Sequence, residues 1–162
     1  MGDATCTGKK AHAGAFGDWP WPSLRRILFA DGSLQQPRWL QGAELASFAD
    51  CRITFSGFQL DQSDLDVYER VLGLARLAST GDVAEFDTAD LLRQAGRSTD
   101  EHAHEWLWAS LDRLVAGAVT LNAKGVSYTG RLVVDRECVS EGTRARHWCR
   151  VRLNPLFAGI WA

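Results

Sequence analysis

The spacing of apolar residues changes twice along this chain, and these changes restrict the folds that it can adopt. Between residues 51 and 55, apolar and polar side chains alternate as they do in a half-buried strand. From Val67 through Val71 and Leu74, apolar residues recur every three or four positions, which predicts a helix. Strand-like stretches return after residue 117. The sequence therefore predicts an α+β domain with helices between two sets of strands.

Three helices are expected in the middle of the chain. Ser63 is a suitable cap for the first helix, and a short strand is expected after it at residues 83–86. Thr88 can cap a short second helix at residues 89–95, and Gly96 follows where a left-handed residue is common. A capping-box pattern, Ser-x-x-Glu at residues 98–101, opens the third helix. The tight turn between the last two helices makes them a helix-turn-helix candidate.

Strands are expected on both sides of these helices. They are predicted at residues 26–29, 44–48, 51–55, 118–121, 126–134 and 144–153, the second and third as a hairpin. The order helix, strand, helix, helix, strand, strand is that of a winged helix, a helix-turn-helix with a β wing, here with an extra N-terminal β-hairpin. We expect this domain to span residues 23–162.

Residues 1–22 are expected to form a flexible N-terminal arm, because the first fifteen are mostly small or polar and show no apolar period. The arm ends in Trp19-Pro20-Trp21-Pro22, in which each proline favours extended backbone at the preceding residue. This segment either docks on a partner or packs its indoles on the domain.

The composition excludes several classes of protein. With 46% hydrophobic and 23% charged residues, the chain is typical of a soluble globular domain. No apolar run reaches the roughly 18 residues of a membrane span, so no membrane partner is expected. Four cysteines without a C-x-x-C pair are interpreted as reduced thiols of a cytoplasmic protein: Cys6, Cys51, Cys138 and Cys149.

Charge is unevenly distributed along the chain. Residues 1–59 carry a net charge of +1, residues 60–112 carry −8, and residues 113–162 carry +5. This distribution favours contact of one end of the domain with a polyanion. The alternative is that the helices happen to carry acids and the strands arginines.

The last predicted strand is the strongest candidate for that contact. At a period of two, one of its faces carries four arginines around one indole: Arg144, Arg146, Trp148, Arg150 and Arg152. Guanidinium groups suit phosphate oxygens, and an exposed indole can stack on a base or sugar. Lys124 and Arg131 can add to the same side. The alternative is a solvated sheet face or an edge strand that its charge protects from aggregation.

The third helix is a weaker candidate for reading a DNA groove. Recognition helices usually present basic and amide side chains at their first turns, whereas this one begins with acids. The residues that suit DNA at this end are Arg97, Ser98, Thr99 and His102.

No catalytic residues and no cofactor are predicted, and the chain is not expected to be an enzyme. It lacks the G-x-x-x-x-G-K-[ST], G-x-G-x-x-G and G-x-S-x-G motifs. His104-Glu105 begins like the zinc motif H-E-x-x-H, but Trp108 stands in place of the second histidine. His147 and Cys149, with Cys138 nearby, are conceivable zinc ligands, yet four ligands at the usual spacing are absent, so no metal is predicted.

Several segments together resemble TrfA-type plasmid replication initiator proteins. They occur in the family's order between residues 24 and 155, and so cover most of the chain. They are Ile53-Thr54-Phe55-Ser56-Gly57, Gln59-Leu60-Asp61-Gln62-Ser63-Asp64-Leu65-Asp66-Val67, residues 86–92, Gly96-Arg97-Ser98-Thr99, Glu105-Trp106-Leu107, Tyr128 and Gly130-Arg131-Leu132.

The resemblance implies a bacterial cytoplasmic protein, associated with the nucleoid or a plasmid, that acts in plasmid DNA replication. Such initiators contain two winged-helix domains, bind repeated origin sequences (iterons) and recruit a host replication initiator and the replicative helicase. Their N-terminal domain mediates homodimerisation and adds secondary DNA contacts. This chain resembles that domain, and the second domain is expected to be absent from it. Asp100, Glu101 and Glu105 depart from the basic third helix that the family implies.

Two functions therefore remain open. The first is an initiator domain that binds double-stranded origin DNA through the strand arginines and the start of the third helix. The second is a dimerisation or protein-interaction module, or a transcriptional regulator, with little DNA affinity of its own. The acidic segment and the apolar surface expected from Trp19, Trp21, Trp39 and Trp161 favour the second function.

Overall fold

The computed structural model describes residues 24–48, 50–123, 125–141 and 146–161, and the expected arm at residues 1–22 lies outside them. Its helices are α2 (Leu24–Leu28), α3 (Gln62–Leu77), α4 (Thr88–Gln94), α5 (Glu101–Ala116) and α6 (Pro155–Ile160). Its strands are β1 (Phe29–Ala30), β2 (Trp39–Phe48), β3 (Cys51–Phe58), β4 (Leu60–Asp61), β5 (Val83–Asp87), β6 (Ala118–Ala123), β7 (Val126–Arg131), β8 (Val133–Glu141) and β9 (Arg146–Leu153). The expected mixture of helices and strands is confirmed. Among the described helices, none is long and apolar enough to cross a membrane.

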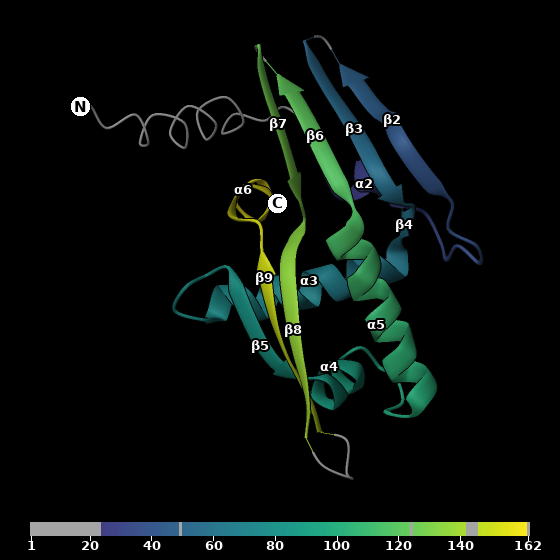
Figure 1. Ribbon diagram of the computed structural model, residues 1–162, viewed down its shortest axis with the longest axis vertical. Helices are drawn as coiled ribbons and strands as arrows, with labels where there is room; N and C mark the ends of the chain where they lie inside the picture. Colours follow the sequence, from purple (N-terminus) through teal and green to yellow (C-terminus); the bar gives the residue numbers. More distant parts are fainter. Residues whose placement is uncertain (1–23, 49, 124, 142–145, 162) are drawn as a thin grey trace.

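Two antiparallel sheets contain most of the strands. The first has the order β2-β3-β6-β7, so the predicted N-terminal hairpin forms one side of it. The second has the order β5-β9-β8, with β9 between a strand that precedes α4 and one that follows α5. Only Leu132 separates β7 from β8, and the chain passes there from one sheet to the other (Figure 1). The single strand expected at residues 126–134 is therefore divided between the two sheets.

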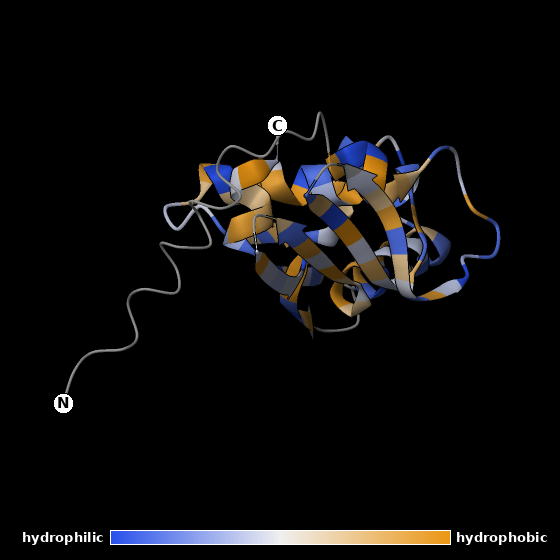
Figure 2. Ribbon diagram, turned by 90° about the horizontal axis from the view of Figure 1, so that it is seen from above, coloured by the Kyte–Doolittle hydropathy of each residue, from blue (hydrophilic) through white to orange (hydrophobic). Residues whose placement is uncertain are grey.

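One hydrophobic core joins the helices to both sheets. The apolar stripe predicted for α5 is buried at Ala103, Leu107, Leu111 and Leu114. The stripe predicted for α3 is buried at Val67 and Val71 and partly buried at Leu74, but its last expected position, Leu77 or Ala78, is exposed because α3 ends there at the surface. The buried residues of both stripes pack in one cluster with Ile53 of β3 and Val151 of β9. Hydrophobic and hydrophilic residues alternate along the strands, as the period of two requires (Figure 2).

The C-terminal indole belongs to this core. Trp161 is only 7% exposed and lies edge-on against Tyr68 and Phe29, with ring centroids 4.7 and 6.0 Å away. Arg76 of α3 donates hydrogen bonds to the carbonyl oxygens of Ala158 and Trp161, and so fixes the end of α6. Trp161 therefore does not supply the spare apolar surface that was expected of it.

The three central helices begin at aspartates rather than at the hydroxyl residues predicted. The predicted and observed caps are Ser63 and Asp61 for α3, Thr88 and Asp87 for α4, and Ser98 and Asp100 for α5. A carboxylate caps a helix as well as a hydroxyl does, and its charge suits the positive end of the helix dipole. The sequence pattern does not distinguish two capping residues that stand one or two positions apart.

Residues 24–28 form a helix, which overlaps the strand predicted at residues 26–29. Leu24 and Leu28 are both buried, and their four-residue spacing places them on one face of α2. The strand that follows, β1, has only two residues and pairs in parallel with β4. Burial against the core, which the sequence does not reveal, decides the conformation of this short segment.

The turn between α4 and α5 is confirmed. Gly96 has a φ of +71°, which a residue with a side chain rarely adopts. The backbone N–H groups of Gly96 and Arg97 donate to the carbonyl oxygens of Arg93 and Leu92, at 3.0 and 2.9 Å. These bonds satisfy the last carbonyl groups of α4, as a left-handed C-cap does.

Two of the cysteines are not reduced thiols. Cys138 on β8 and Cys149 on β9 are direct cross-strand partners and form a disulfide. Cys51 is free and buried, and Cys6 lies outside the described residues. The cysteine spacing gave no sign of this bond, because the pairing of β8 with β9 brings the two residues together.

Candidate nucleic-acid interface

The outer face of the β5-β9-β8 sheet carries several of the residues predicted to contact DNA. Side chains along β9 alternate between buried (Cys149, Val151, Leu153) and exposed (Trp148, Arg150, Arg152), so the predicted alternation is confirmed over these residues. Arg146 belongs to β9 through its backbone pairing with Glu141, whereas Arg144 lies outside the described residues.

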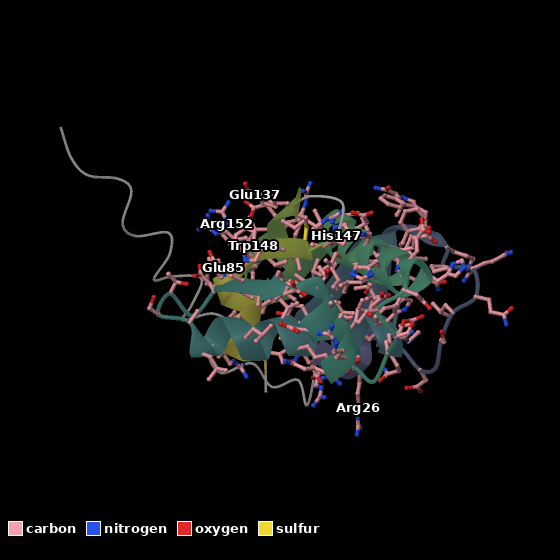
Figure 3. All side chains as sticks on the ribbon, turned by 90° about the horizontal axis from the view of Figure 1, so that it is seen from below. Arg26, Glu85, Glu137, His147, Trp148 and Arg152 are labelled. Atoms are coloured by element: carbon pink, nitrogen blue, oxygen red, sulfur yellow. A yellow bond between two sulfur atoms is a disulfide. The ribbon has the colours of Figure 1, made fainter. Side chains whose placement is uncertain are left out.

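Acidic side chains flank the β9 arginines on both neighbouring strands. Arg150 stands between Glu85 of β5 and Glu137 of β8, and Arg152 stands opposite Asp135. The Arg150 Nε atom lies 3.7 Å from Glu85 Oε1, and Arg152 forms an ion pair with Asp135. Glu85, Glu137 and Arg152 gather on the same side of the molecule (Figure 3).

These acids remove the positive charge that the sequence predicted for the outer face. Over its described part, the face carries the four carboxylates of Glu85, Asp87, Asp135 and Glu137 and two guanidinium groups, a net charge of −2. The ion pairs are about half exposed, so each stabilises the fold little, but together they offset the field of the arginines. Over these described residues, the face therefore carries no net positive charge that would attract a phosphate backbone.

Sequence reasoning missed this compensation, although a signal for it was present. Asp135 and Glu137 alternate with the same period of two as the arginines, and so do Glu85 and Asp87. Only the register of the three strands shows that these acids share the arginine face.

The start of α5 holds the second group of predicted DNA contacts. Arg97, Ser98 and Thr99 are exposed in the turn before the helix, and His102 is exposed in its first turn. The guanidinium group of Arg97 stacks on the Trp106 ring, with Arg97 Cζ 3.4 Å from the ring centroid. This stacking holds Arg97 in place at the surface while leaving its charge unpaired by any described carboxylate.

Acids also lie beside this second group. Asp100 caps α5, and hydrogen bonds from the Ala103 backbone N–H and from Ser98 lower the pKa of its carboxyl, which is therefore ionised at neutral pH. The imidazole of His102 lies 3.7 Å from Glu105 Oε2. The start of α5 thus presents one unpaired guanidinium group among carboxylates.

The remaining predicted contacts lie elsewhere. Arg131 is exposed at the end of β7, in the other sheet, and Lys124 lies outside the described residues. The structure therefore distributes the predicted DNA-binding residues over the β9 face, the start of α5 and the end of β7.

His147, predicted to face the core, is only half-buried and lies against α5. Its ring centroid is 5.1 Å from that of His104 and 5.9 Å from that of Trp108. His104 is held by Asp100 O at 2.9 Å and by Thr88 Oγ1 at 3.0 Å, so both of its nitrogens are engaged. The described residues include no group of three or more side chains suited to a metal, and the disulfide occupies the sulfur atoms of Cys138 and Cys149.

Comparison with models of protein families gave no match, and comparison with curated proteins also gave none. Two solved structures of RctB are similar in fold. The crystal structure of RctB domains 2-3 (RctB-155-483) has a TM-score of 0.59 and 14% identity, over 76% of this chain and 53% of that chain. The structure of selenomethionine derivatives of domains 2 and 3 of RctB has a TM-score of 0.63 and 13% identity, over 85% of this chain and 60% of that chain.

The chain thus spans somewhat more than half the length of these RctB structures. At this level of identity the likeness shows a shared fold. The likeness is to RctB domains, and it does not single out the TrfA type.

Proposed function

We propose that this chain supplies a domain of a DNA replication initiator. The observation that carries the proposal is the fold likeness to domains of RctB, a replication initiator, over 85% of this chain. The TrfA-like segments support it independently, because they were identified from the sequence and resemble another type of initiator. The proposed role is to bind DNA or protein rather than to catalyse a reaction.

We further propose that α3, β5, α4, α5, β8 and β9 form a winged helix. The order of these elements supports this, since α4 and α5 enclose the tight turn at Gly96 and β8 and β9 form the hairpin after them. Strands β6 and β7 are inserted between α5 and β8, where they join the N-terminal hairpin in the first sheet.

Within this arrangement, we propose that any contact with origin DNA is made at the start of α5. Arg97 is the central residue, since its guanidinium group is exposed and carries no described ion pair, with Ser98, Thr99 and His102 beside it. Arg150 and Arg152 are proposed to add little, because acids on β5 and β8 offset their charge. Lys124, Arg131, Arg144 and Arg146 remain candidates for phosphate contacts.

Fluorescence anisotropy of a labelled duplex, titrated with the protein at several salt concentrations, tests this proposal. We expect Arg97→Ala to weaken the binding of duplexes of any sequence. It should also reduce the salt slope, the steepness with which log K falls as log salt concentration rises, by about 0.9, the value for one phosphate contact. The double variant Arg150→Ala/Arg152→Ala should leave the slope nearly unchanged. Arg70→Ala, on α3 and paired with Asp66, is the matched control.

Two results would contradict the proposal. A larger loss of slope in the double variant than in Arg97→Ala would show that the β9 face binds phosphates despite its acids. The absence of any binding at low salt would show that DNA recognition lies outside this domain, and would favour an assembly role.

A specific observation supports assembly as a second candidate function. Strand β2 is at the edge of its sheet. The ring of Trp39 on β2 packs edge-on against the ring of Phe58, and the two residues are 52% and 41% exposed. An edge strand with exposed aromatic rings can pair with another chain. We propose homodimerisation through β2 as this function, with a host replication initiator and the replicative helicase as further partners.

Light scattering over a range of protein concentrations measures this dimer. Trp39→Ser should shift the monomer–dimer equilibrium toward the monomer. Leu77→Ser is the control, since Leu77 is 87% exposed at the end of α3 and does not belong to the sheet that contains β2. A wild-type protein that stays monomeric at high micromolar concentration contradicts the assembly function.

A further inference from the structure

A hollow lies on the molecular surface between α4 and the indole of Trp148. Its volume is about 430 Å³, and apolar side chains of Leu74, Phe86 and Leu91 line it. Phe86 and Leu91 are themselves core residues, so these walls are fixed by packing rather than by solvent-exposed rotamers. Trp148 supplies the remaining wall and is 37% exposed.

The apolar surface continues beyond the hollow. Val139 of β8 is the cross-strand partner of Trp148 and is also exposed. Trp148 was expected to stack on a nucleic acid, but the structure places it beside carboxylates. Glu85 and Trp148 lie close together on the same side of the molecule, and both line the hollow (Figure 3).

Three carboxylates form part of the lining. Asp87 uses Oδ1 to cap α4, accepting from the backbone N–H groups of Ala89 and Asp90, and no described group donates to its Oδ2. Glu85 and Asp90 make only exposed pairs, with Arg150 at 3.7 Å and with Arg93 at 2.8 Å. Exposed pairs of this kind are weak, so a cation that enters the hollow can compete for both carboxylates.

We propose that this hollow binds an arginine or lysine side chain in a basic segment of a partner protein. The aliphatic stem would lie on Leu74, the most exposed of the three apolar lining residues, while the cationic head sits against the Trp148 ring and the carboxylates. The same three carboxylates repel phosphates, so a nucleic acid does not fit the charge of the hollow. This inference does not depend on the initiator function.

The probe for the test is the peptide acetyl-Leu-Arg-Leu-Arg-amide, with acetyl-Leu-Glu-Leu-Glu-amide as its acidic counterpart. We expect the basic peptide to shift the ¹H–¹⁵N NMR signals of the Trp148 indole, Asp87 and Gln94, and the acidic one to shift none of them. Trp148→Ala should lower the affinity for the basic peptide about tenfold, which corresponds to roughly 1.4 kcal/mol of binding free energy.

A second variant keeps the test independent of folding. Asp87→Asn retains a good N-cap for α4 and removes one negative charge, and we expect it to lower the affinity for the basic peptide about threefold. Matched controls are Trp39→Ala, which removes an exposed indole from the other sheet, and Asp66→Asn, which removes an exposed acid from α3. Both should bind the peptide as the wild type does.

Several results would overturn the proposal. They are the absence of shifts at millimolar basic peptide, equal binding of the acidic peptide, and equal losses in the control variants. A short DNA duplex that shifts the same signals more strongly than the peptide would assign the hollow to nucleic acid instead.

Discussion

Asp64 on α3 and Arg113 on α5 form a buried ion pair, in which Arg113 Nη2 donates to Asp64 Oδ1 at 2.6 Å. The same carboxylate accepts from Ser110 Oγ at 2.7 Å and from the backbone N–H of Asp61 at 3.2 Å. Asp64 is 0% exposed, and both of its carboxylate oxygens accept hydrogen bonds, so the buried charge is compensated. The pair ties the start of α3 to the end of α5, and so gives one of the TrfA-like acids a structural role.

Removal of this carboxylate should destabilise the protein strongly. Asp64→Ala leaves the Arg113 guanidinium group largely buried without its partner, and we expect a loss of about 3–5 kcal/mol in the free energy of unfolding. Urea denaturation followed by tryptophan fluorescence measures this loss. Asp66→Ala on the same helix breaks only the partly exposed pair with Arg70 and should cost less than about 1 kcal/mol. Similar losses in the two variants would contradict the role of Asp64.

Gly57 should not tolerate a side chain. It has a φ of +149°, and a Cβ atom there would lie 2.8 Å from Gly117 Cα, where β3 passes the end of α5. We expect Gly57→Ala to lower the free energy of unfolding by about 1–3 kcal/mol. Gly73→Ala is the matched control, because Gly73 is exposed within α3 and a Cβ there has open space. It should stabilise the protein by about 0.5–1 kcal/mol, and a loss in this control would contradict the explanation.

Asp61 should make the stability depend on pH in the acidic range. Burial alone would raise the pKa of its carboxyl, but hydrogen bonds from Ser63 and from the backbone N–H groups of Leu34 and Asp64 outweigh burial and lower the pKa below 3.8. Because the folded-state pKa is lowered, the ionised carboxylate contributes its full stability above the unfolded value. This contribution is lost as the pH falls through the lowered folded value.

The variant Asp61→Asn isolates this contribution. Asparagine caps a helix about as well as aspartate, but it carries no titrating charge. Between about pH 5 and pH 2, we expect the free energy of unfolding to fall less steeply in Asp61→Asn than in the wild type. Parallel curves from urea denaturation at each pH would show that Asp61 does not contribute.

The disulfide between Cys138 and Cys149 should stabilise the β8–β9 pair. The bond closes a short loop, with the two cysteines 11 residues apart, which predicts a contribution of about 2–3 kcal/mol. Treatment with a reductant should therefore lower the Tm measured by circular dichroism. A Cys138→Ser/Cys149→Ser variant should start at the lower Tm and should not respond to the reductant. A Tm that the reductant lowers equally in both proteins would assign the effect to another cysteine.

Much of the fold could be predicted from local patterns. The long helices α3 and α5, the hairpin of β2 and β3, the turn at Gly96 and the alternation along β9 all depend on neighbouring residues. The short segment at residues 24–28 could not be predicted in this way, because burial of Leu24 and Leu28 in the core decides its conformation.

The sequence by itself determined which β9 side chains face outward, because alternation is a property of a single strand. Only the tertiary structure decided what those side chains meet. Strand β9 pairs with β5, more than 60 residues earlier, and this pairing sets Glu85 beside Arg150 and Asp87 beside Trp148. The net charge of a surface depends on which strands are neighbours, and register is a long-range property of the packed chain. For this reason the two β9 arginines whose side chains the structure describes, Arg150 and Arg152, both take part in ion pairs in the fold.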